Sequence, residues 1–501
     1  MKSDKQLFSK LWALHLISPL GLLRITCSLV KEGVNLMAML DFARKYYALR
    51  VAASCEDEDI SYKQLYVRSK AVAAYLHYVC HVRKGTRVGV LCRNSSELLY
   101  VLFGLSSIGA RIYFLNLDMS DEQLKAVLGN QKIELCVCDD NLERILDRES
   151  SLPCVLISDI VCALSHACFQ HFPVRILFPC GELVVLTGGT SGHFKTAGRK
   201  PSLFRFISPF LSLLESVRIY NYQKVYVAPP IYHGFGLAAT IVTFAIGKTL
   251  YICNKFSAER CNDIISRNQI DMLIAVPTML RRMLHEGPAD LHTLKCVLSG
   301  GAPLDERLVR DVENNLGQVL YNLYGTSEAG FFVLATPADL NTHPLCIGRP
   351  IRGVAVQIID KDKQGIGTLC VKSTWAMDGM SRHWQCTGDR AYMDDDNIIS
   401  LRGRADTMIV SGGENVYPED VENILLTCQY VDQAAVIPIE SEDFGQGLEA
   451  YVVVSRPASE DEISQWLKTK VARYQMPRRI FIVQELPILQ TGKIAKQRCK
   501  V

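Results

Sequence analysis

Strand-sized apolar runs alternate with helix-sized segments along most of this chain, and this alternation limits the fold more than any other feature of the sequence. The runs at 87–93, 134–139 and 271–276 are apolar and short enough to be strands. Segments of ten or more residues with helical patterning separate such runs from the next ones. Strands joined in this way form βαβ units, whose strands are parallel. We therefore predict an α/β fold in which helices flank parallel sheets.

The pattern changes towards the C-terminus, which indicates more than one domain. At 345–402 the helical segments fade and short strand-like runs with glycine turns follow, as in a distorted β-barrel. A compact α+β pattern comes after it. Because 501 residues exceed what one hydrophobic core normally organises, several domains are expected. We predict a leader at 1–45, a large N-terminal domain at 46–403 and a small, mobile α+β C-terminal domain at 404–501.

The overall composition excludes some classes of protein. Hydrophobic residues make up 49% of the chain and charged residues 21%, which argues against a disordered chain. The net charge is only +3 and no long basic block occurs, so no nucleic-acid partner is expected. The 18 cysteines are scattered, without a Cys-x-x-Cys pair or a cluster at zinc spacing. We expect buried free thiols in a reducing cytoplasm rather than disulfides.

The first 35 residues form an apolar and basic leader. Residues 11–23 are apolar and lie between Lys10 and Arg24, but a helix that spans a bilayer needs about 20 apolar residues. Residues 1–35 carry five basic and two acidic side chains, which suits contact with anionic lipid headgroups. We expect this leader to lie on the inner membrane face of an otherwise cytoplasmic protein. A helix docked on the body of the protein is the alternative.

A loop rich in glycine and hydroxyl groups, LTGGTSGHFK at 186–195, follows an apolar run. Backbone N–H groups and hydroxyls donate hydrogen bonds to phosphate oxygens, and lysine adds positive charge. The spacing of a Walker A loop is absent, and a flexible surface loop is the alternative interpretation. The candidate phosphate-binding residues are Thr187, Gly189, Thr190, Ser191, Gly192 and Lys195.

This loop resembles the Thr-Ser-Gly-Thr-Thr-Gly-x-Pro-Lys signature of the adenylate-forming superfamily, which contains acyl-CoA synthetases, luciferases and nonribosomal adenylation domains. It departs from the signature at Gly188, Ser191 and Phe194, where the family has Ser, Thr and Pro. Further motifs of the family follow in the family's order. They are APPIYHGFG at 228–236, LSGGAPL at 298–304, YGTSE at 324–328, TGD at 387–389, GRAD at 403–406, SGGENVYP at 411–418 and TGK at 491–493. The resemblance covers roughly residues 50–500 and is closest to bacterial fatty acyl-CoA synthetases.

The resemblance implies a two-step reaction with ATP, Mg²⁺ and coenzyme A. A carboxylic acid is first converted to acyl-AMP, and the acyl group then passes to the thiol of CoA. For the nucleotide, the resemblance assigns Gly300, Gly301, Ala302 and Tyr324 to the adenine side, Asp389 to the ribose and Arg404 to the ribose or phosphate. It also counts Gly325 and Ser327 among the ATP-binding residues, with the Ser327 hydroxyl near the phosphates. For catalysis it assigns Lys493, Glu328, His233 and Thr190, with Glu328 as the Mg²⁺ ligand. It also assigns Asp406 to a hinge and Ser411, Gly412 and Gly413 to a tunnel for the CoA arm.

These residue types suit the roles that the resemblance gives them. A glycine backbone approaches a flat ring closely, and the aromatic ring of Tyr324 stacks on the other face. An ionised Asp389 accepts hydrogen bonds from ribose hydroxyls. Glu328 offers the hard oxygen that Mg²⁺ prefers, and Lys493 places positive charge where negative charge develops.

The segment after His233 bears on the substrate. Amino-acid-activating members carry an aspartate there, whereas this chain has FGLAAT at 235–240. An apolar wall favours an acyl or aryl chain. We predict a medium- or long-chain fatty acid as the substrate.

Two other functions stay open. One is an acyl-AMP ligase that loads the phosphopantetheine of a separate acyl carrier protein. The other is a non-catalytic binding relative, which the altered phosphate loop and Ala391 in place of the family's glycine favour. The retention of Glu328, Asp389, Arg404 and Lys493 opposes that second alternative.

Overall fold

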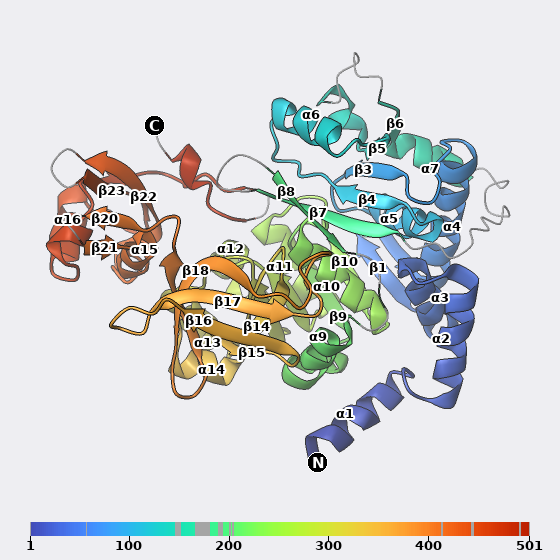
Figure 1. Cartoon of the computed structure of the whole chain (residues 1–501), viewed down its shortest axis with the longest axis horizontal. Coiled ribbons are helices and arrows are strands. Elements are labelled where there is room, and N and C mark those ends of the chain that lie inside the picture. Colours follow the sequence, from blue (N-terminus) through green and yellow to red (C-terminus); the bar gives the residue numbers. More distant parts are fainter. Residues whose placement is uncertain are drawn as a thin grey trace. The chain divides into compact units, whose positions relative to one another are not determined.

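The structure is a computed structural model of the whole chain (Figure 1). It describes residues 2–56, 58–145, 152–165, 181–188, 194–199, 202, 205–411, 414–441, 445–489 and 492–499. The chain forms two compact units. The first contains residues 1–275, 290–297 and 374–381, and the second contains residues 276–289, 298–373 and 382–501. The predicted domain boundary at 403/404 remains a prediction.

The first unit contains a six-stranded sheet in the order β6-β5-β3-β4-β7-β8. Its strands are β3 (Arg87–Leu91), β4 (Arg111–Phe114), β5 (Leu135–Cys138), β6 (Cys154–Leu156), β7 (Glu182–Gly188) and β8 (Phe194–Arg199). The helices that alternate with them are α5 (Ser96–Ile108), α6 (Asp121–Asn130) and α7 (Ile157–Ser165). The first five strands are parallel, as predicted. The sequence did not reveal β8, which returns antiparallel to β7 directly after the glycine-rich loop.

A second run of strands in the same unit follows the order β11-β9-β10-β1-β2. These strands are β1 (Val51–Cys55), β2 (Glu58–Ser61), β9 (Lys224–Val227), β10 (Thr249–Ile252) and β11 (Met272–Ala275). The accompanying helices are α4 (Tyr62–Tyr78), α9 (Ile207–Ser212), α10 (Gly234–Ala245) and α11 (Ala258–Asn268). All pairs except β1–β2 are parallel. Ser61 caps α4 and exchanges hydrogen bonds with Gln64, an arrangement known as a capping box.

Three helices precede β1 in this unit, and Figure 1 shows α2 beside α3 while α1 continues away from them. They are α1 (Lys2–Ala13), α2 (Pro19–Glu32) and α3 (Leu36–Tyr47). The apolar run 11–23 is therefore not one element, because a turn at 14–18 divides it between two helices. No helix in the described part of the chain is both long and apolar enough to cross a membrane.

The second unit begins with α12 (Pro277–Glu286) and contains an antiparallel run of strands in the order β16-β17-β18-β19-β15-β14-β13. The strands are β13 (Leu320–Thr326), β14 (Gly330–Ala335), β15 (Cys346–Pro350), β16 (Val354–Ile359), β17 (Gly367–Ser373), β18 (Gln385–Met393) and β19 (Ile399–Arg404). The other elements are β12 (Cys296–Gly300), which starts in the first unit, α13 (Glu306–Leu316) and α14 (Pro337–Thr342). Phe332, Leu369 and Val371 are among the apolar side chains that close a common core for these strands. The predicted change to short strands is confirmed, and their antiparallel pairing is an addition from the structure.

The C-terminal part of the second unit is a small α+β assembly with its own core. Its sheet runs β21-β20-β23-β22, and β24 pairs with β23. The elements are β20 (Ile409–Ser411), β21 (Glu414–Val416), α15 (Pro418–Leu425), β22 (Val431–Ser441), β23 (Gly445–Val454), α16 (Glu460–Lys468) and β24 (Arg479–Ile482). Val421, Val436 and Ile463 are buried between helices and sheet. The last α-helix, α16, ends at Lys468, where the Thr469 hydroxyl bonds to the carbonyl of Trp466 and closes the last turn.

Candidate active site

Two adjacent strands of the second unit bring together Asp389, which is predicted to bind the ribose, and Arg404, which is predicted to bind the ribose or a phosphate. Asp389 on β18 lies directly opposite Arg404 on β19. Arg404 Nη1 is 3.4 Å from Asp389 Oδ1, and the hydroxyl of Tyr324 donates to the other carboxylate oxygen. The backbone N–H of Asp389 donates to Thr387 Oγ1 at 3.1 Å. The motifs TGD, YGTSE and GRAD therefore meet in one hydrogen-bonded cluster.

The hydrogen bonds and the positive charge around the Asp389 carboxylate do not fully offset the cost of burying its charged form. Burial raises the pKa of Asp389 above its ordinary value, and the Tyr324 hydrogen bond and the Arg404 charge offset only part of this effect. Burial and the neighbouring carboxylate also raise the pKa of the Tyr324 hydroxyl, so it remains a donor. An ionised carboxylate accepts up to about four hydrogen bonds. Because these partners use only some of them, Asp389 keeps acceptor capacity for hydroxyl groups such as those of a ribose.

Arg404 is held from both sides. Its Nε and Nη2 atoms form two parallel hydrogen bonds to the carboxylate of Asp406, at 2.7 and 3.0 Å. Gly388 lies beneath the guanidinium with φ near +83°, and a Cβ there would meet Arg404 Nη2 at 3.0 Å. Only glycine adopts this backbone without strain while leaving room for the guanidinium. The predicted hinge residue Asp406 is thus tied to the predicted nucleotide site through Arg404.

Lys493 lies within electrostatic range of this cluster. It follows Gly492, whose N–H bonds to the carbonyl of Leu489 at 2.8 Å and whose carbonyl accepts from the hydroxyl of Thr278 on α12. A Cβ at Gly492 would collide with Val276, so the loop approaches α12 closely because this residue is glycine. Residue Lys493 is exposed overall, yet crowding of its ammonium group by protein atoms lowers its pKa. The Arg404 charge acts in the same direction and Asp389 opposes it.

The predicted magnesium ligand lies in the turn after β13. β13 carries Tyr324 and Gly325, and Ser327 and Glu328 stand in the turn that leads to β14. A Cβ at Gly325 would meet the backbone of Gly330 on the opposite strand. Glu328 is half-buried and supplies a single carboxylate, which suits an ion that keeps several waters and uses substrate phosphates as ligands. No group of three or more metal-binding side chains occurs among the described residues.

The predicted adenine strand is β12, which ends at Gly300. Gly301 follows with φ near +83°, and Ala302 comes next in the turn before α13. The hydroxyl of Ser299 is buried and has no hydrogen-bond partner in the described part of the chain. A buried polar group without a partner is costly, so this hydroxyl is suited to a polar ligand at the strand end. The signal that sequence reasoning missed here is a hydroxyl next to the glycine pair.

His233 lies in the first unit, at the N-cap position of α10. Its side chain makes no capping hydrogen bond, and its ring is tilted against Tyr232 with ring centroids 4.9 Å apart. Its carbonyl accepts from Leu237 N at 2.8 Å and so begins the helix. Two residues before His233, the backbone N–H of Ile231 donates to the side-chain oxygen of Asn94 at 2.8 Å and fixes the start of this turn. The predicted catalytic role of His233 remains a prediction.

The phosphate loop is described only at its flanks. β7 and β8 form a hairpin in which Thr187 pairs with Lys195 and Gly188 with Phe194. The predicted ligands Gly189, Thr190, Ser191 and Gly192 lie outside the described residues, as do Gly412 and Gly413 of the predicted CoA tunnel. Ser411 ends β20 and pairs with Glu414.

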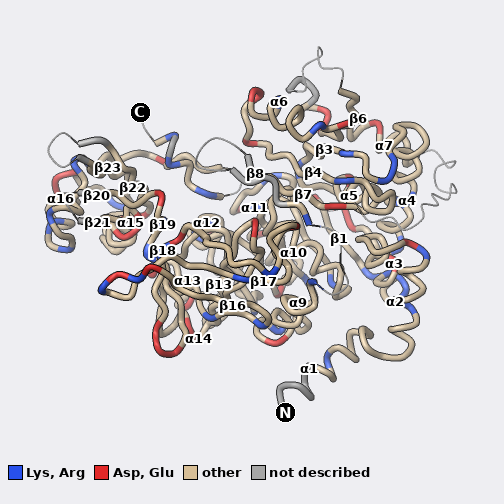
Figure 2. The backbone as a smooth tube through the Cα atoms, in the orientation of Figure 1, with Lys and Arg blue, Asp and Glu red and all other residues tan. Residues whose placement is uncertain are grey.

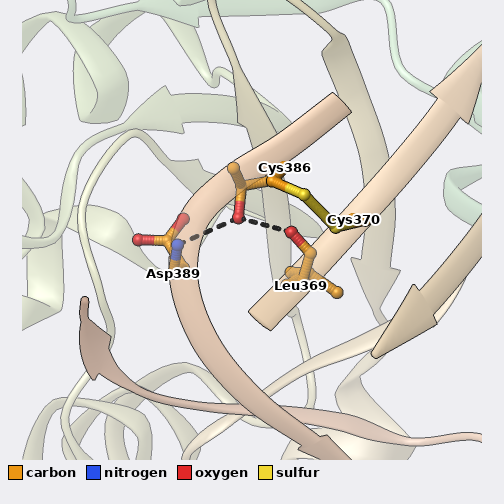
Figure 3. The surroundings of a disulfide bond; sticks show 5 residues. Leu369, Cys370, Cys386 and Asp389 are labelled. Carbon is orange, nitrogen blue, oxygen red and sulfur yellow. Dashed lines mark hydrogen bonds between the residues drawn. A yellow bond between two sulfur atoms is a disulfide. The ribbon is translucent and has the colours of Figure 1, made fainter. Parts of the chain in front are cut away.

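A disulfide beside the ribose cluster corrects the expectation of free thiols. Cys370 on β17 and Cys386 on β18 are direct cross-strand partners and are bonded (Figure 3). The next residue, Thr387, donates its hydroxyl to the carbonyl of Leu369 at 3.1 Å and accepts from Asp389 N (Figure 3). The wide spacing of the cysteines in the sequence gave no signal of this pair, because only the strand register brings it together. Most other described cysteines are buried free thiols, as expected.

Comparison with known proteins decides the family. The family model of the AMP-binding enzyme matches residues 41–380, and that of the AMP-binding enzyme C-terminal domain matches residues 420–493. The chain belongs to the AMP-binding enzyme family. The predicted class, an AMP-forming acid–thiol ligase that uses ATP, Mg²⁺ and coenzyme A, is confirmed at this level.

The similar relatives of this AMP-binding enzyme cover nearly the whole chain. The 2-succinylbenzoate–CoA ligase of Bacillus subtilis is 24% identical over 90% of this chain and 95% of its own length. The corresponding ligase of Lactococcus lactis is 28% identical over 83% and 90%. Among solved structures, the B. subtilis o-succinylbenzoate CoA synthetase with its acyl-adenylate has a TM-score of 0.80 at 23% identity, covering 92% of this chain and 98% of that one. An anthranilate CoA ligase with anthranoyl-AMP has a TM-score of 0.82 at 20% identity, covering 93% and 96%. The predicted fold class is confirmed.

Proposed function

We propose that this AMP-binding enzyme activates a medium- or long-chain fatty acid to acyl-AMP and transfers the acyl group to coenzyme A. The observation that carries the reaction is the cluster of Asp389, Arg404 and Lys493, which combines a hydroxyl acceptor with two cations in one unit. A ribose hydroxyl acceptor beside cations is the donor and acceptor set that a nucleotide needs.

In the first step, a carboxylate oxygen of the acid forms a bond to the α-phosphorus of ATP, and pyrophosphate leaves with the electron pair of the broken P–O bond. Lys493 stabilises the negative charge that develops on the oxygens around this phosphorus. Asp389 orients the ribose, and the hydroxyl of Tyr324 fixes the position of the Asp389 carboxylate. Glu328 is the residue that would hold Mg²⁺, which neutralises phosphate charge when it is bound.

In the second step, the thiol of CoA attacks the acyl carbon of the mixed anhydride, a thioester forms, the thiol gives up its proton and AMP leaves. The predicted hinge at Asp406 would let the C-terminal domain exchange Lys493 for the segment Ser411–Gly413 between the steps. Such reuse of one site by domain movement is common in enzymes with a closing element.

The choice of acid rests on α10. Along this helix Gly234, Ala238 and Val242 recur at intervals of four residues and keep part of their surface accessible. No charged side chain occurs between His233 and Lys248. A wall of small apolar groups accommodates an alkyl chain by excluding water from it.

An aryl acid is the second candidate, because the similar relatives are named for 2-succinylbenzoate. That acid carries two carboxylates. A second carboxylate buried against α10 would need a cation, and α10 supplies none. This argument favours an acid with a single carboxylate and an apolar body.

The test is pyrophosphate release by the purified protein with Mg·ATP and acids from acetate to oleate, together with benzoate and 2-succinylbenzoate. Each acid is assayed with CoA, with a phosphopantetheinylated carrier protein and without a thiol. Release that requires a medium or long fatty acid and rises with CoA supports the proposal. Pyrophosphate release with 2-succinylbenzoate but with none of the fatty acids would show that the proposed substrate is wrong. Release that only the carrier protein stimulates would show that the proposed acceptor, CoA, is wrong. Binding of ATP without release for any acid would favour a non-catalytic relative.

A further inference from the structure

Helix α2 presents its apolar side chains to the outside and its polar side chains to the protein, which reverses the usual pattern of a surface helix. Leu22, Leu23 and Val30 keep 51%, 60% and 83% of their surface exposed. Ser28 and Glu32, on the opposite side, are buried. The exposed residues of α2 are Pro19, Leu20, Leu22, Leu23, Thr26, Cys27, Val30 and Lys31, and Lys31 is the only charged residue among them.

Polar contacts to α3 and α4 fix this orientation. Ser28 donates to Asp41 at 2.8 Å and accepts from Lys45 at 2.8 Å. Glu32 accepts from the hydroxyl of Tyr66 at 2.6 Å and from Lys70 at 3.2 Å. Turning the helix by half a revolution would bury the leucines but would leave these charged groups unpaired in the protein. The outward apolar face is therefore a consequence of the sequence and not of a loose attachment.

The charges at the edge of this face are positive. Arg24 and Lys31 border it on one side, and Lys31 keeps half of its side chain exposed. Figure 2 shows blue stretches along both α1 and α2. The acidic residue of α2, Glu32, has a side chain that is only 3% exposed and paired with Lys70. An apolar face bordered by cations complements a surface of hydrocarbon beneath anionic headgroups.

The end of α1 adds exposed aromatic rings to the same N-terminal segment. Phe8 and Trp12 are 59% and 47% exposed and lie 6.3 Å apart, ring centre to ring centre. Tryptophan is enriched at the boundary between headgroups and hydrocarbon, because its ring is apolar while its N–H seeks a polar partner. The junction to α2 is held on the body by the ring of His15, which stacks on Tyr46 at 4.2 Å.

We propose that the outward face of α2 docks on an anionic lipid surface. The leucines enter the outer hydrocarbon layer and the helix lies along the surface. Arg24 and Lys31 add positive charge beside the headgroups, while Lys31 keeps its hydrogen bonds to Asp41 and Tyr66. A second copy of the chain fits this face less well, because a twofold contact between two such faces would bring their bordering cations together. This inference does not depend on the acid that the enzyme activates.

Flotation of the full-length protein with vesicles tests the proposal. The vesicles contain phosphatidylcholine alone or with one third phosphatidylglycerol. We expect binding to the anionic vesicles to be about thirtyfold stronger than to the neutral ones, because each of the two bordering cations contributes roughly a fivefold factor near an anionic surface. L22Q/L23Q should lower binding to anionic vesicles by about a hundredfold, roughly tenfold for each leucine removed from hydrocarbon.

The matched control is Leu49→Gln. Leu49 is 88% exposed but lies beyond α3, outside the docking face, so its replacement should leave vesicle binding unchanged. Circular dichroism and the melting temperature verify that both variants fold. Equal binding of L22Q/L23Q and the unaltered protein would overturn the proposal, as would equal binding to neutral and anionic vesicles. A dimer in sedimentation velocity that L22Q/L23Q converts to a monomer, without vesicle binding, would overturn it in favour of an interface between copies.

Discussion

Two carboxylates in this protein, the buried Asp41 and the largely buried Asp389, have opposite electrostatic settings. Asp41 on α3 is completely buried and receives hydrogen bonds or ion pairs from Ser28, Arg44 and Lys45 at 2.6–2.9 Å. Burial alone would raise the pKa of Asp41, but these contacts overcome it and hold the pKa well below its usual range. Burial raises the pKa of Asp389, and its partners do not overcome that effect.

The difference separates a structural anchor from a ligand site. Asp41 is fully satisfied by the protein, so its role ends with attaching α2 to the body. The surroundings of Asp389 do not fully compensate its charge, and we propose that a bound polar ligand completes its set of hydrogen bonds. The comparison predicts that changes near Asp389 reduce activity with little loss of stability, whereas changes at Asp41 reduce stability with little direct effect on the reaction.

The largest expected effect is a loss of activity on replacing Lys493, which belongs to the proposed ligand site. Lys493→Met keeps most of the side-chain volume but removes the charge, and we expect acyl-AMP formation to fall about 10²- to 10³-fold, the cost of losing one preorganised group at developing charge. Because the pKa of Lys493 is lowered, its charge is lost at a lower pH than for an ordinary lysine. The alkaline limb of the rate of the unaltered enzyme should therefore lie below pH 10.4.

Lys468→Met is the matched control for this variant, since Lys468 is an exposed lysine at the end of α16. Single-turnover measurement of pyrophosphate release gives the rate, and thermal unfolding gives the stability. A Lys493→Met variant with nearly unchanged release would remove Lys493 from the site. One that melts far below the control would place Lys493 among the structural residues instead.

The second effect concerns the anchor. Asp41→Asn leaves Arg44 and Lys45 without their carboxylate, and we expect the free energy of unfolding to fall by about 2 kcal/mol at pH 7, discounted from a fully buried pair because both cations are partly exposed. Urea unfolding measures this quantity. The rate of acyl-AMP formation at a temperature where both proteins are folded should stay within about twofold.

The pH dependence sharpens this prediction. Because the pKa of Asp41 is lower in the folded protein than in the unfolded chain, its stabilising contribution is complete above the unfolded value of about 3.9. The contribution disappears as the pH falls from there towards the lowered folded value. The difference in unfolding free energy between Asp41→Asn and the unaltered protein should therefore shrink below about pH 4. A difference in unfolding free energy that stays constant down to pH 3 would contradict the lowered pKa of Asp41.

An effect of similar size is expected at Asp389. Asp389→Asn retains the shape but loses a charged acceptor, and a hydrogen bond to a charged group contributes about 1.5–3 kcal/mol, so KM for ATP should rise roughly ten- to hundredfold. Because the folded pKa is raised, the ionised form opposes folding at pH 7, and the variant should be as stable as the unaltered protein or slightly more so. A marked loss of stability would make Asp389 a second anchor and would end the contrast with Asp41.

Much of the fold follows from local sequence patterns. The strands and helices around 87–139 and 224–275 were predictable because period and length carry the signal, and the cap at Ser61 was predictable because its partner is three residues away. The orientation of α2 was not. Its apolar residues indicate a face, but the sequence does not say which side the body covers, and the buried charges of α3 and α4 decide it.

In the candidate site, too, the sequence predicted some features and could not predict others. The ordered motifs indicated Asp389, Arg404, Tyr324 and Lys493 as one set. That Asp389 and Arg404 face each other depends on the register of β18 and β19, and that Thr278 holds the Lys493 loop depends on a contact across 214 residues. Register and long-range contact also explain why the disulfide between Cys370 and Cys386 was missed.

That disulfide gives the smallest expected effect and the last test of the ligand side. It ties β18 to β17 immediately before Thr387, whose hydroxyl bonds both Leu369 and the backbone of Asp389. Replacing both cysteines by serine removes the covalent tie but leaves those hydrogen bonds, so KM for ATP should rise only about two- to fivefold, well within the 1.4 kcal/mol that a tenfold change represents. Dithiothreitol should reproduce this rise in the unaltered enzyme and have no effect on the double variant. A KM that responds to neither treatment would show that the hydrogen bonds of Thr387 alone position the Asp389 carboxylate.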